Sequence, residues 1–374
     1  MGIGQHTTFY LGPESIDSML KILREDGYVV YGPVFRDGAI IYDEISSSSQ
    51  LPRGLKDRQG PGTYRVERRE DDAFFGFVVG PHSWKKFLIP PRMKLVTVNR
   101  KGETVTHVED GKRMAFVGVR SCELAALQIL DKIFLQGPFV DPVYASKRKN
   151  IFIAAVNCTE PGENCFCLSM GTGPKVKDGY DISLTEVVGD GIHYFIGYAG
   201  SERGEKLLKA AGARPAADKE LIEAEDLMEK SRTKFRKNLD TNGLKELLYR
   251  NIESPVYTEV AERCLACANC TLVCPTCFCN IIEETTFLDG DYVERWRRMD
   301  SCFTADFSYI HGGSIRVSRM SRYRQWFMHK LATWVDQFGM MGCVGCGRCI
   351  TWCPVGIDIT EEAAKIRKTE VMNR

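Results

Sequence analysis

Two stretches of sequence decide the fold, Cys264-Leu-Ala-Cys267-Ala-Asn-Cys270-Thr-Leu-Val-Cys274-Pro275 and Cys343-Val-Gly-Cys346-Gly-Arg-Cys349-Ile-Thr-Trp-Cys353-Pro354. In each run, three cysteines stand at positions i, i+3 and i+6. A fourth cysteine follows after three more residues and is itself followed by proline. A short peptide with this spacing can wrap an iron–sulfur cubane and present a thiolate at three of its corners. The small residues between the cysteines let the backbone approach closely.

The fourth cysteine of each run has a separate role in this pattern. In ferredoxins with two clusters it ligates the cluster of the other run. The sequence therefore predicts two [4Fe–4S] clusters, the first held by Cys264, Cys267, Cys270 and Cys353 and the second by Cys343, Cys346, Cys349 and Cys274. Zinc is the competing interpretation. Structural zinc sites usually pair two separated Cys-x2-Cys units, which is a different pattern.

Composition limits the remaining function classes. The chain has 374 residues, which predicts two or three domains, and its net charge of +1 gives no sign of nucleic-acid binding. No apolar run is long enough for direct membrane insertion, and residues 1–10 lack the pattern of a signal peptide. We therefore expect a cytoplasmic protein. Because disulfides are disfavoured there, the 15 cysteines are interpreted mainly as metal ligands.

The predicted fold class is α+β. A mixed α/β domain is expected over residues 1–237, a linker over 238–254 and an α-helical ferredoxin-type domain over 255–374. The first domain should contain hairpins at 29–42 and 187–196, strands at 94–98, 113–119 and 151–156, and helices at 122–134 and 217–237. The turn of the second hairpin is Gly189-Asp190-Gly191.

The two runs are far apart, with Cys274 and Cys343 separated by 69 positions. We expect the insert between them to be helical. Residues 316–338 carry a broad apolar and aromatic face, and Gly339 follows as a C-cap. The insert is also rich in arginine: Arg295, Arg297, Arg298, Arg316, Arg319, Arg322 and Arg324. These arginines form either a docking face for anionic groups or a solvated surface.

Four further cysteines, Cys122, Cys158, Cys165 and Cys167, lie in the first domain. Cys122 and Cys158 each follow a predicted strand, and Cys122 opens a helix. Neighbouring parallel strands would bring both to one sheet edge, where a helix N-terminus favours an anionic group. The four thiolates are predicted to hold a third [4Fe–4S] cluster. Zinc, or cysteines without metal, are the alternatives.

Three cysteines, Cys277, Cys279 and Cys302, have no role in this scheme. They either pack against a cluster pocket or ligate an additional centre. The six histidines form no metal-spaced pair, and no catalytic residue is predicted.

Five segments carry a resemblance to a known family: Phe87–Arg92, Gly118–Ala125, Cys264–Cys279, Arg322–Lys330 and Gly342–Asp358. Over nearly its whole length the chain is similar to the beta subunit of sulfhydrogenases and to the A subunit of anaerobic sulfite reductase. The resemblance implies an electron-transfer subunit. A flavoprotein, diaphorase-type partner would oxidise a nicotinamide nucleotide, and a catalytic hydrogenase or reductase partner would receive the electrons.

The resemblance places no flavin or nucleotide site on this chain, and the sequence shows no G-x-G-x-x-G after a strand. The leading hypothesis is therefore an iron–sulfur electron-transfer subunit. The alternative is a catalytic reductase with its own active site at the N-terminal cluster, which would need an iron position left free by the four cysteines there. A third possibility is a scaffold in which the clusters only stabilise the fold.

Overall fold

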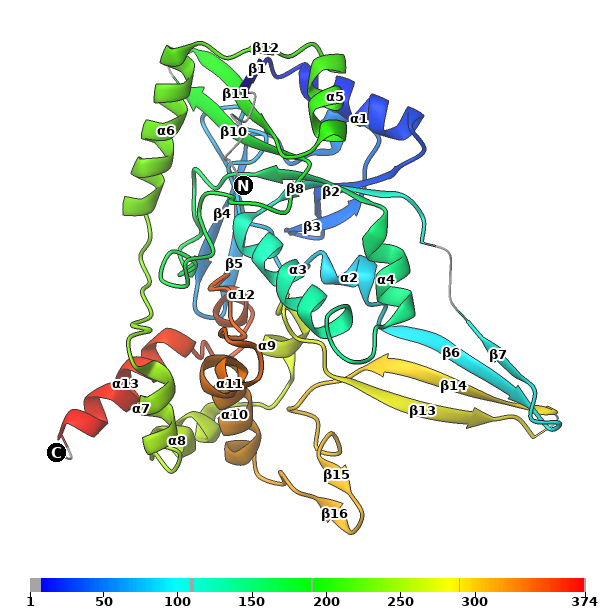
Figure 1. The fold of residues 1–374 in the computed structure, drawn as a ribbon. Coiled ribbons are helices and arrows are strands. Elements are labelled where there is room, and N and C mark those ends of the chain that lie inside the picture. Colours follow the sequence, from blue (N-terminus) through cyan, green and yellow to red (C-terminus); the bar gives the residue numbers. More distant parts are fainter. Residues whose placement is uncertain (1–7, 108–110, 190, 289, 373–374) are drawn as a thin grey trace.

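The computed structural model describes residues 8–107, 111–189, 191–288 and 290–372. Residues 1–7 lie outside the described residues, and they make up most of the segment that was expected to contain no signal peptide. Asp190 of the predicted turn also lies outside the described residues. The chain forms two halves, with the α/β half above and the helical half below in Figure 1.

The upper half is built on one eight-stranded sheet in the order β12-β1-β11-β10-β9-β8-β2-β3. The bounds of these strands are β1 (Thr8–Leu11), β2 (Val29–Arg36), β3 (Ala39–Glu44), β8 (Met114–Val119), β9 (Ile151–Val156), β10 (Ile182–Gly189), β11 (Ile192–Ala199) and β12 (Arg214–Pro215). The central strands β2, β8, β9 and β10 pair in parallel, and the outer pairings are antiparallel. The predicted strands and hairpins of this half are confirmed.

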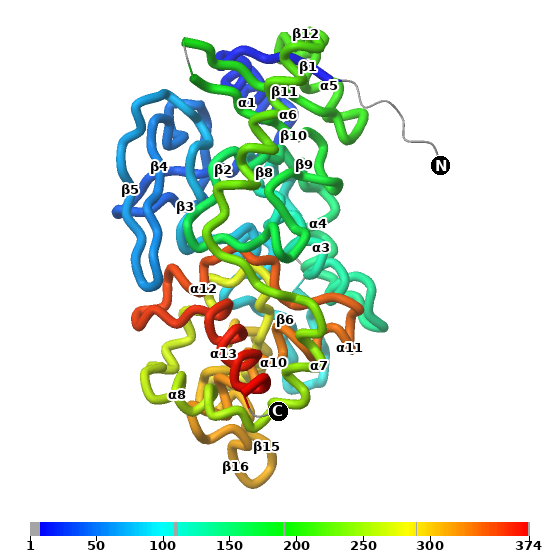
Figure 2. The backbone as a smooth tube through the Cα atoms, turned by 90° about the vertical axis from the view of Figure 1, so that its left-hand side faces the viewer, coloured from blue at the N-terminus to red at the C-terminus, as the bar shows by residue number. Residues whose placement is uncertain are grey.

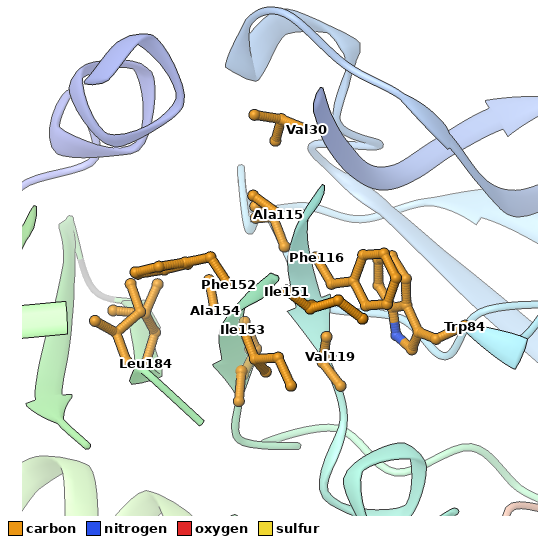
Figure 3. Packing of buried hydrophobic residues seen from close by; sticks show 14 of the residues in the cluster. Val30, Trp84, Ala115, Phe116, Val119, Ile151, Phe152, Ile153, Ala154 and Leu184 are labelled. Atoms are coloured by element: carbon orange, nitrogen blue, oxygen red, sulfur yellow. The ribbon is translucent and has the colours of Figure 1, made fainter. Parts of the chain in front are cut away.

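The core of the upper half lies around β8 and β9, in which every residue is buried. Such continuous apolar strands are typical of a parallel sheet covered on both faces. Figure 3 shows Phe116 of β8 beside Trp84 in this core, with Ile153 of β9 and Leu184 of β10 successively further from Trp84. The helices of this half are α1 (Ser15–Glu25), α2 (Lys85–Leu88), α3 (Ser121–Phe134), α4 (Pro142–Lys149), α5 (Glu202–Ala210) and α6 (Asp218–Thr233), with a 3-10 turn at Ser48–Gln50.

The lower half is mainly helical around a second core. Its helices are α7 (Leu244–Arg250), α8 (Val256–Arg263), α9 (Asn269–Leu272), α10 (Arg319–Met328), α11 (Trp334–Phe338), α12 (Arg348–Thr351) and α13 (Ile359–Met372), and a π-helical segment, His329–Thr333, joins α10 to α11. The aromatic face predicted for residues 316–338 is buried here, with Tyr323, Trp326 and Phe327 in the core. Gly339 ends α11 in the left-handed conformation. The α+β fold class with a helical ferredoxin-like C-terminal part is confirmed.

The prediction that the whole insert is helical is wrong for its first part. Residues 280–314 form the strands β13 (Asn280–Thr286), β14 (Tyr292–Met299), β15 (Tyr309–Ile310) and β16 (Gly313–Ser314). The charged residues of β13 and β14 pair across the hairpin, because Glu284 lies opposite Arg295 and Glu283 binds Arg298 at 2.6 Å. Cross-strand ion pairs of this kind stabilise a sheet. Several insert arginines are therefore used within the fold.

A four-stranded sheet joins the two halves. Strand β14 pairs with β6 (Arg92–Asn99), and β6 pairs with β7 (Thr104–Thr106), so the order is β13-β14-β6-β7. This sheet projects to the right of the molecule in Figure 1. The domain boundary expected at residues 238–254 stays a prediction. Strands from both sides of this segment, β6 and β14, pair in one sheet, and α7 lies within the segment.

A second connection comes from the hairpin of β4 (Leu55–Gly60) and β5 (Thr63–Arg68), which Figure 2 shows extending from the upper half towards α12. At its tip, the N–H of Gly62 donates to the carbonyl of Ile350 at 3.1 Å. Gly62 has a φ of +73°, and an added Cβ would lie 2.9 Å from the carbonyl oxygen of Cys353. The hairpin tip thus lies directly on the second cysteine run.

A buried ion pair forms the third connection. Arg348 of α12 donates to Glu123 of α3 at 2.6 Å, and their side chains are 3% and 1% exposed. Glu123 also accepts hydrogen bonds from the Tyr42 hydroxyl at 2.6 Å and the Trp84 indole at 3.1 Å. The carboxylate raises the pKa of Arg348 well above its usual range, against the effect of burial.

Removing one partner of this pair should destabilise the protein strongly. Glu123→Gln leaves the Arg348 guanidinium buried without its counter-charge, which costs about 3–5 kcal/mol. Urea unfolding of the anaerobic holoprotein should show this loss as a lower midpoint. The control is Asp72→Asn at the exposed Arg53–Asp72 pair, which should cost less than about 1 kcal/mol. Equal midpoints for the two variants would contradict the role given to the buried pair.

Candidate iron–sulfur centres

The two cysteine runs fold into the same loop. Ala266 and Ala268 of the first run have φ values of +52° and +67°, and the equivalent Gly345 and Gly347 have +66° and +74°. The N–H of Ala266 donates to the sulfur of Cys264 at 3.4 Å, and the N–H of Gly345 donates to that of Cys343, also at 3.4 Å. The short helices α9 and α12 follow in equivalent positions. Each loop therefore curls around its own cysteines and directs N–H groups towards sulfur.

The first cysteine set, Cys264, Cys267, Cys270 and Cys353, surrounds one cavity. Three of these cysteines come from the first run and Cys353 comes from the second, and Cys349 of the second run also lines the cavity, so the crossed arrangement stays a prediction. Phe303, Tyr323 and Trp326 form an aromatic wall of the same cavity. Burial is the main cause that raises the pKa of Cys270, and the sulfurs of Cys264, Cys353 and Cys267 raise it further. Four thiols around an apolar hollow are a suitable donor set for a cubane.

The second cysteine set, Cys343, Cys346, Cys349 and Cys274, is also gathered in one place. Burial raises the pKa of Cys349, and the sulfurs of Cys343, Cys346 and Cys274 add to this rise. Burial likewise raises the pKa of Cys343 to about 12, with the sulfurs of Cys346 and Cys274 as further causes. As thiolates, these groups would repel one another. Bound iron would offset this repulsion, because its positive charge replaces the protons. Cys349 also lines the cavity of the first set, so the two sets adjoin.

Two buried lysines face the loop that carries Cys274. The Lys330 ammonium donates to the Cys274 sulfur at 3.2 Å, to the Thr276 hydroxyl at 2.8 Å and to the Gly342 carbonyl at 3.2 Å. The Lys85 ammonium donates to the carbonyls of Cys274 at 2.9 Å and Cys277 at 3.0 Å. Within the described residues, neither ammonium lies within salt-bridge distance of a carboxylate.

These lysines act on the sulfurs instead. Although burial lowers the pKa of Lys330, the sulfurs of Cys274, Cys277 and Cys343 raise it well above its usual range. A hydrogen bond from Cys277, together with the Lys330 ammonium, lowers the pKa of Cys274 well below its usual range. Lys330 therefore supplies a positive charge to the second set. It belongs to a segment of the family resemblance, but its place beside Cys274 could not be read from the sequence.

The third cysteine set, Cys122, Cys158, Cys165 and Cys167, lies at the edge of the sheet where it was predicted. Strands β8 and β9 are parallel neighbours; Cys122 stands in the first turn of α3 after β8, and Cys158 follows β9 by two residues. Burial raises the pKa of Cys167, and the sulfurs of Cys165 and Cys158 raise it further. The Cys167 sulfur in turn raises the pKa of Cys122. The four thiols thus lie within electrostatic reach of one another at this edge, and their role as ligands stays a prediction.

A cation and a neighbouring set complete this site. The Arg120 guanidinium lies 3.8 Å from the Cys158 sulfur and is otherwise bound to the carbonyls of Phe75 and Phe77, each at 2.8 Å. The Cys346 sulfur of the second set contributes to the raised pKa of Cys122, Cys165 and Cys167. The Cys165 sulfur also lies 3.7 Å from the Cys346 carbonyl oxygen, so the third set adjoins the second.

The loop that carries Cys165 and Cys167 packs on the second cysteine run. The Phe166 N–H donates to the Gly345 carbonyl at 2.8 Å, and the Thr172 hydroxyl donates to the Val344 carbonyl at 2.7 Å. A Cβ at Gly345 would lie 2.6 Å from the Cys167 backbone, and one at Gly347 would lie 2.5 Å from the Asn164 carbonyl oxygen. Only glycine fits at these two contacts.

Cys277, Cys279 and Cys302 remain outside the three sets. Cys277 is the main cause that lowers the pKa of Cys274 of the second set, and Cys302 is the main cause that lowers the pKa of Cys279. Within the described residues, no three His, Cys, Asp or Glu side chains are placed to bind a single metal ion, and no helix is long and apolar enough to cross a membrane.

Comparison with known proteins agrees with this geometry. The family described as the 4Fe-4S dicluster domain matches residues 263–357, which contain both cysteine runs. The chain is also 32% identical over 361 residues to sulfhydrogenase 2 subunit beta of Pyrococcus furiosus, an alignment that covers 96% of this chain and 98% of that protein. The expected resemblance is thereby confirmed. With its two cysteine runs inside a dicluster domain, the chain is an iron–sulfur electron-transfer protein and belongs to the family of sulfhydrogenase beta subunits.

Proposed function

We propose that this chain holds three [4Fe–4S] clusters and passes electrons between a flavoprotein partner and a catalytic hydrogenase or reductase partner. The observation that carries this proposal is the row formed by the three cysteine sets. Cys349 of the second set lines the cavity of the first, and the Cys165 sulfur of the third set lies 3.7 Å from the Cys346 carbonyl oxygen of the second. A relay requires redox centres that adjoin one another in this way.

Each set would supply four cysteine ligands in the proposal. When bound, such clusters provide one-electron transfer, and the protein tunes it through ligation, hydrogen bonds to sulfur and burial. Here the Ala266 and Gly345 N–H groups bind sulfur, Lys330 and Arg120 add positive charge, and the aromatic wall of the first cavity excludes water. Four ligands at the third set would leave no iron position for a substrate, which favours relay over catalysis there.

The chemical steps that this chain is proposed not to perform are assigned to its partner subunits. Flavin and nicotinamide chemistry would belong to the diaphorase-type subunit, and bond-breaking chemistry to the catalytic subunit. Cys267 is exposed, so the first set is the end of the row that a partner could reach most directly. We also propose that the complex works in the cytoplasm, where the cysteine thiols would stay reduced.

Metal content tests the number of clusters. Anaerobically purified protein should contain about twelve irons, since each [4Fe–4S] cluster holds four. Cys165→Ser should lose one of three EPR species and about four irons. Cys302→Ser, at a half-buried cysteine outside the three sets, should keep all twelve. About eight irons in the wild type, or an unchanged spectrum for Cys165→Ser, would refute the third cluster.

Gly347→Ala should remove the third cluster selectively. The equivalent position in the first run is Ala268, so alanine is compatible with the loop itself. At position 347, however, the added Cβ collides with the Asn164 carbonyl at 2.5 Å and displaces the Cys165 segment. Iron analysis should fall from about twelve to about eight. Ala268→Gly is the matched control and should keep every cluster; a full iron content in Gly347→Ala would contradict the proposed packing.

Lys330→Met should lower the reduction potential of the second-set cluster, because reduction adds negative charge beside a lost cation. A change of about 60 mV in a one-electron couple corresponds to about 1.4 kcal/mol. Potentiometric titration followed by EPR would measure the shift. Lys209→Met on α5, which removes an exposed lysine, is the control. An unchanged or raised potential in Lys330→Met would show that Lys330 has another role.

A further inference from the structure

Two polar groups in the aromatic wall of the first cavity have no hydrogen-bond partner among the described residues. They are the hydroxyl of Tyr323 and the Nε1–H of Trp326, and both atoms are closed off from solvent. The two residues are only 1% and 4% exposed. Nearly all buried donors in folded proteins are paired, because leaving one unpaired is unfavourable. Two unpaired donors in one wall therefore point to an acceptor that binds there.

Both donors belong to residues that line the cavity of the first cysteine set. Tyr323 and Trp326 stand three positions apart on α10, which places them on the same face of the helix. Their ring centroids lie 5.8 Å apart. All four cysteines of the first set line the same cavity. The residues with unpaired donors and the thiols therefore surround one space.

The same core contains a second buried tyrosine, whose hydroxyl is paired. Tyr257 is 1% exposed, like Tyr323, and its ring centroid lies 6.3 Å from that of Tyr323. Its hydroxyl has the Met328 sulfur as a partner at 3.5 Å, and Tyr257 is not among the residues that line the cavity. Of these two tyrosines, the one without a partner is therefore the one beside the cysteines.

Both unpaired groups are able to donate. Burial is the main cause that raises the pKa of Tyr323 well above its usual range, and the sulfurs of Cys270 and Cys264 are among the further causes. The hydroxyl therefore keeps its proton at neutral pH. The indole N–H of Trp326 is a donor only. The wall thus offers two protons to a group bound in the cavity.

Unpaired donors also occur beside the other cysteine sets. Arg120 and Arg348 each have one buried nitrogen without a hydrogen-bond partner among the described residues. The Arg120 guanidinium lies 3.8 Å from a sulfur of the third set, and Arg348 directly precedes Cys349 of the second set. The other two such atoms are on Ser254 and Asp358. Most of the unpaired buried atoms therefore belong to residues beside a cysteine set.

We propose that the Tyr323 hydroxyl and the Trp326 indole N–H donate hydrogen bonds to sulfur atoms of the cluster held by the first set. This inference rests on the proposed function, because that cluster supplies the acceptors. Hydrogen bonds to sulfur are one of the means by which a protein sets the potential of a cluster. Reduction adds negative charge to the cluster, so the two donors stabilise the reduced state more and raise the reduction potential.

These neutral donors have the place that buried cations have at the other sets. Lys330 and Arg120 lie beside sulfurs of the second and third sets. By contrast, no Lys or Arg is among the described residues that line the first cavity. The aromatic donors therefore stabilise the reduced cluster without placing a charge in an apolar wall.

The test measures the potential of the first-set cluster in the anaerobic holoprotein. EPR during a potentiometric titration gives the potential of each cluster, and iron analysis counts the clusters. The first-set signal is identified as the one that Cys267→Ser alters, because Cys267 is a proposed ligand of this set alone. The signals of the other two sets serve as internal references.

Tyr323→Phe removes the hydroxyl and keeps the ring. At the potential where the wild-type first-set cluster is half reduced, the ratio of reduced to oxidised cluster should fall about tenfold, which corresponds to about 59 mV for one electron. Iron content and the other two signals should stay unchanged. Tyr257→Phe is the matched control. It removes a hydroxyl of the same core outside the cavity lining, and the potential should not move.

Hyperfine spectroscopy observes the hydrogen bonds themselves. After exchange into D2O, the first-set signal should show deuterium coupling, and Tyr323→Phe should remove one coupled deuteron. Wild-type protein labelled with 15N in the indole rings should show a 15N coupling to the same signal. Trp326→Phe should abolish this coupling, whereas Trp352→Phe, at a tryptophan outside the cavity lining, should retain it. The measurement on labelled wild type depends on no variant.

Separate results would overturn each part of the inference. An unchanged potential in Tyr323→Phe, or an equal shift in Tyr257→Phe, would refute the role of the hydroxyl. The absence of 15N coupling in labelled wild type would refute the role of the indole. Either result with about twelve irons leaves the proposed function intact. Wild-type protein that lacks the first-set signal and about four of those irons would instead refute the proposed function itself.

Discussion

The structure depends on the contact between the 164–167 loop and the second cysteine run. Gly345 and Gly347 leave room for the backbone of that loop, and a single methyl group at either position would collide with it. This contact places Cys165 and Cys167 of the α/β half beside Cys346 of the helical half. Without it, the third cysteine set would lie apart from the second, and the proposed relay of three clusters could not form.

Buried charge is arranged around this contact. Arg348, which lies between two ligand cysteines of the second run, is fixed by Glu123 of the neighbouring half. Lys330 and Arg120 are bound to sulfur and to carbonyl or hydroxyl oxygens. Buried cations are costly unless they are paired, and thiolates or anionic clusters provide that pairing. The same residues that hold the two halves together therefore also set the charge around the cysteine sets.

The sequence was informative where the signal is local. The cysteine spacing predicted that the two runs would form similar loops, because cluster ligation by one loop requires a fixed number of residues between ligands. The apolar strands ending at Val119 and Val156 predicted where Cys122 and Cys158 would lie, because parallel neighbours end at the same sheet edge. The buried aromatic helix after residue 316 was likewise visible in its periodicity.

Features that depend on distant residues could not be predicted in this way. The insert was expected to be helical, but β13 and β14 pair with each other and with β6, almost 200 residues earlier in the chain. The positions of Lys85 and Lys330 beside Cys274 depend on tertiary packing and left no pattern in the sequence.

The central claim is that three cysteine sets hold three clusters in a row with crossed ligands. It is tested most directly by a crystal structure of the anaerobic holoprotein with anomalous data at the iron edge. The account predicts three iron peaks, with Cys353 bonded to the cluster of the first run, Cys274 bonded to that of the second, and the third peak among Cys122, Cys158, Cys165 and Cys167. Two peaks only, or a fourth ligand taken from the same run, would contradict it.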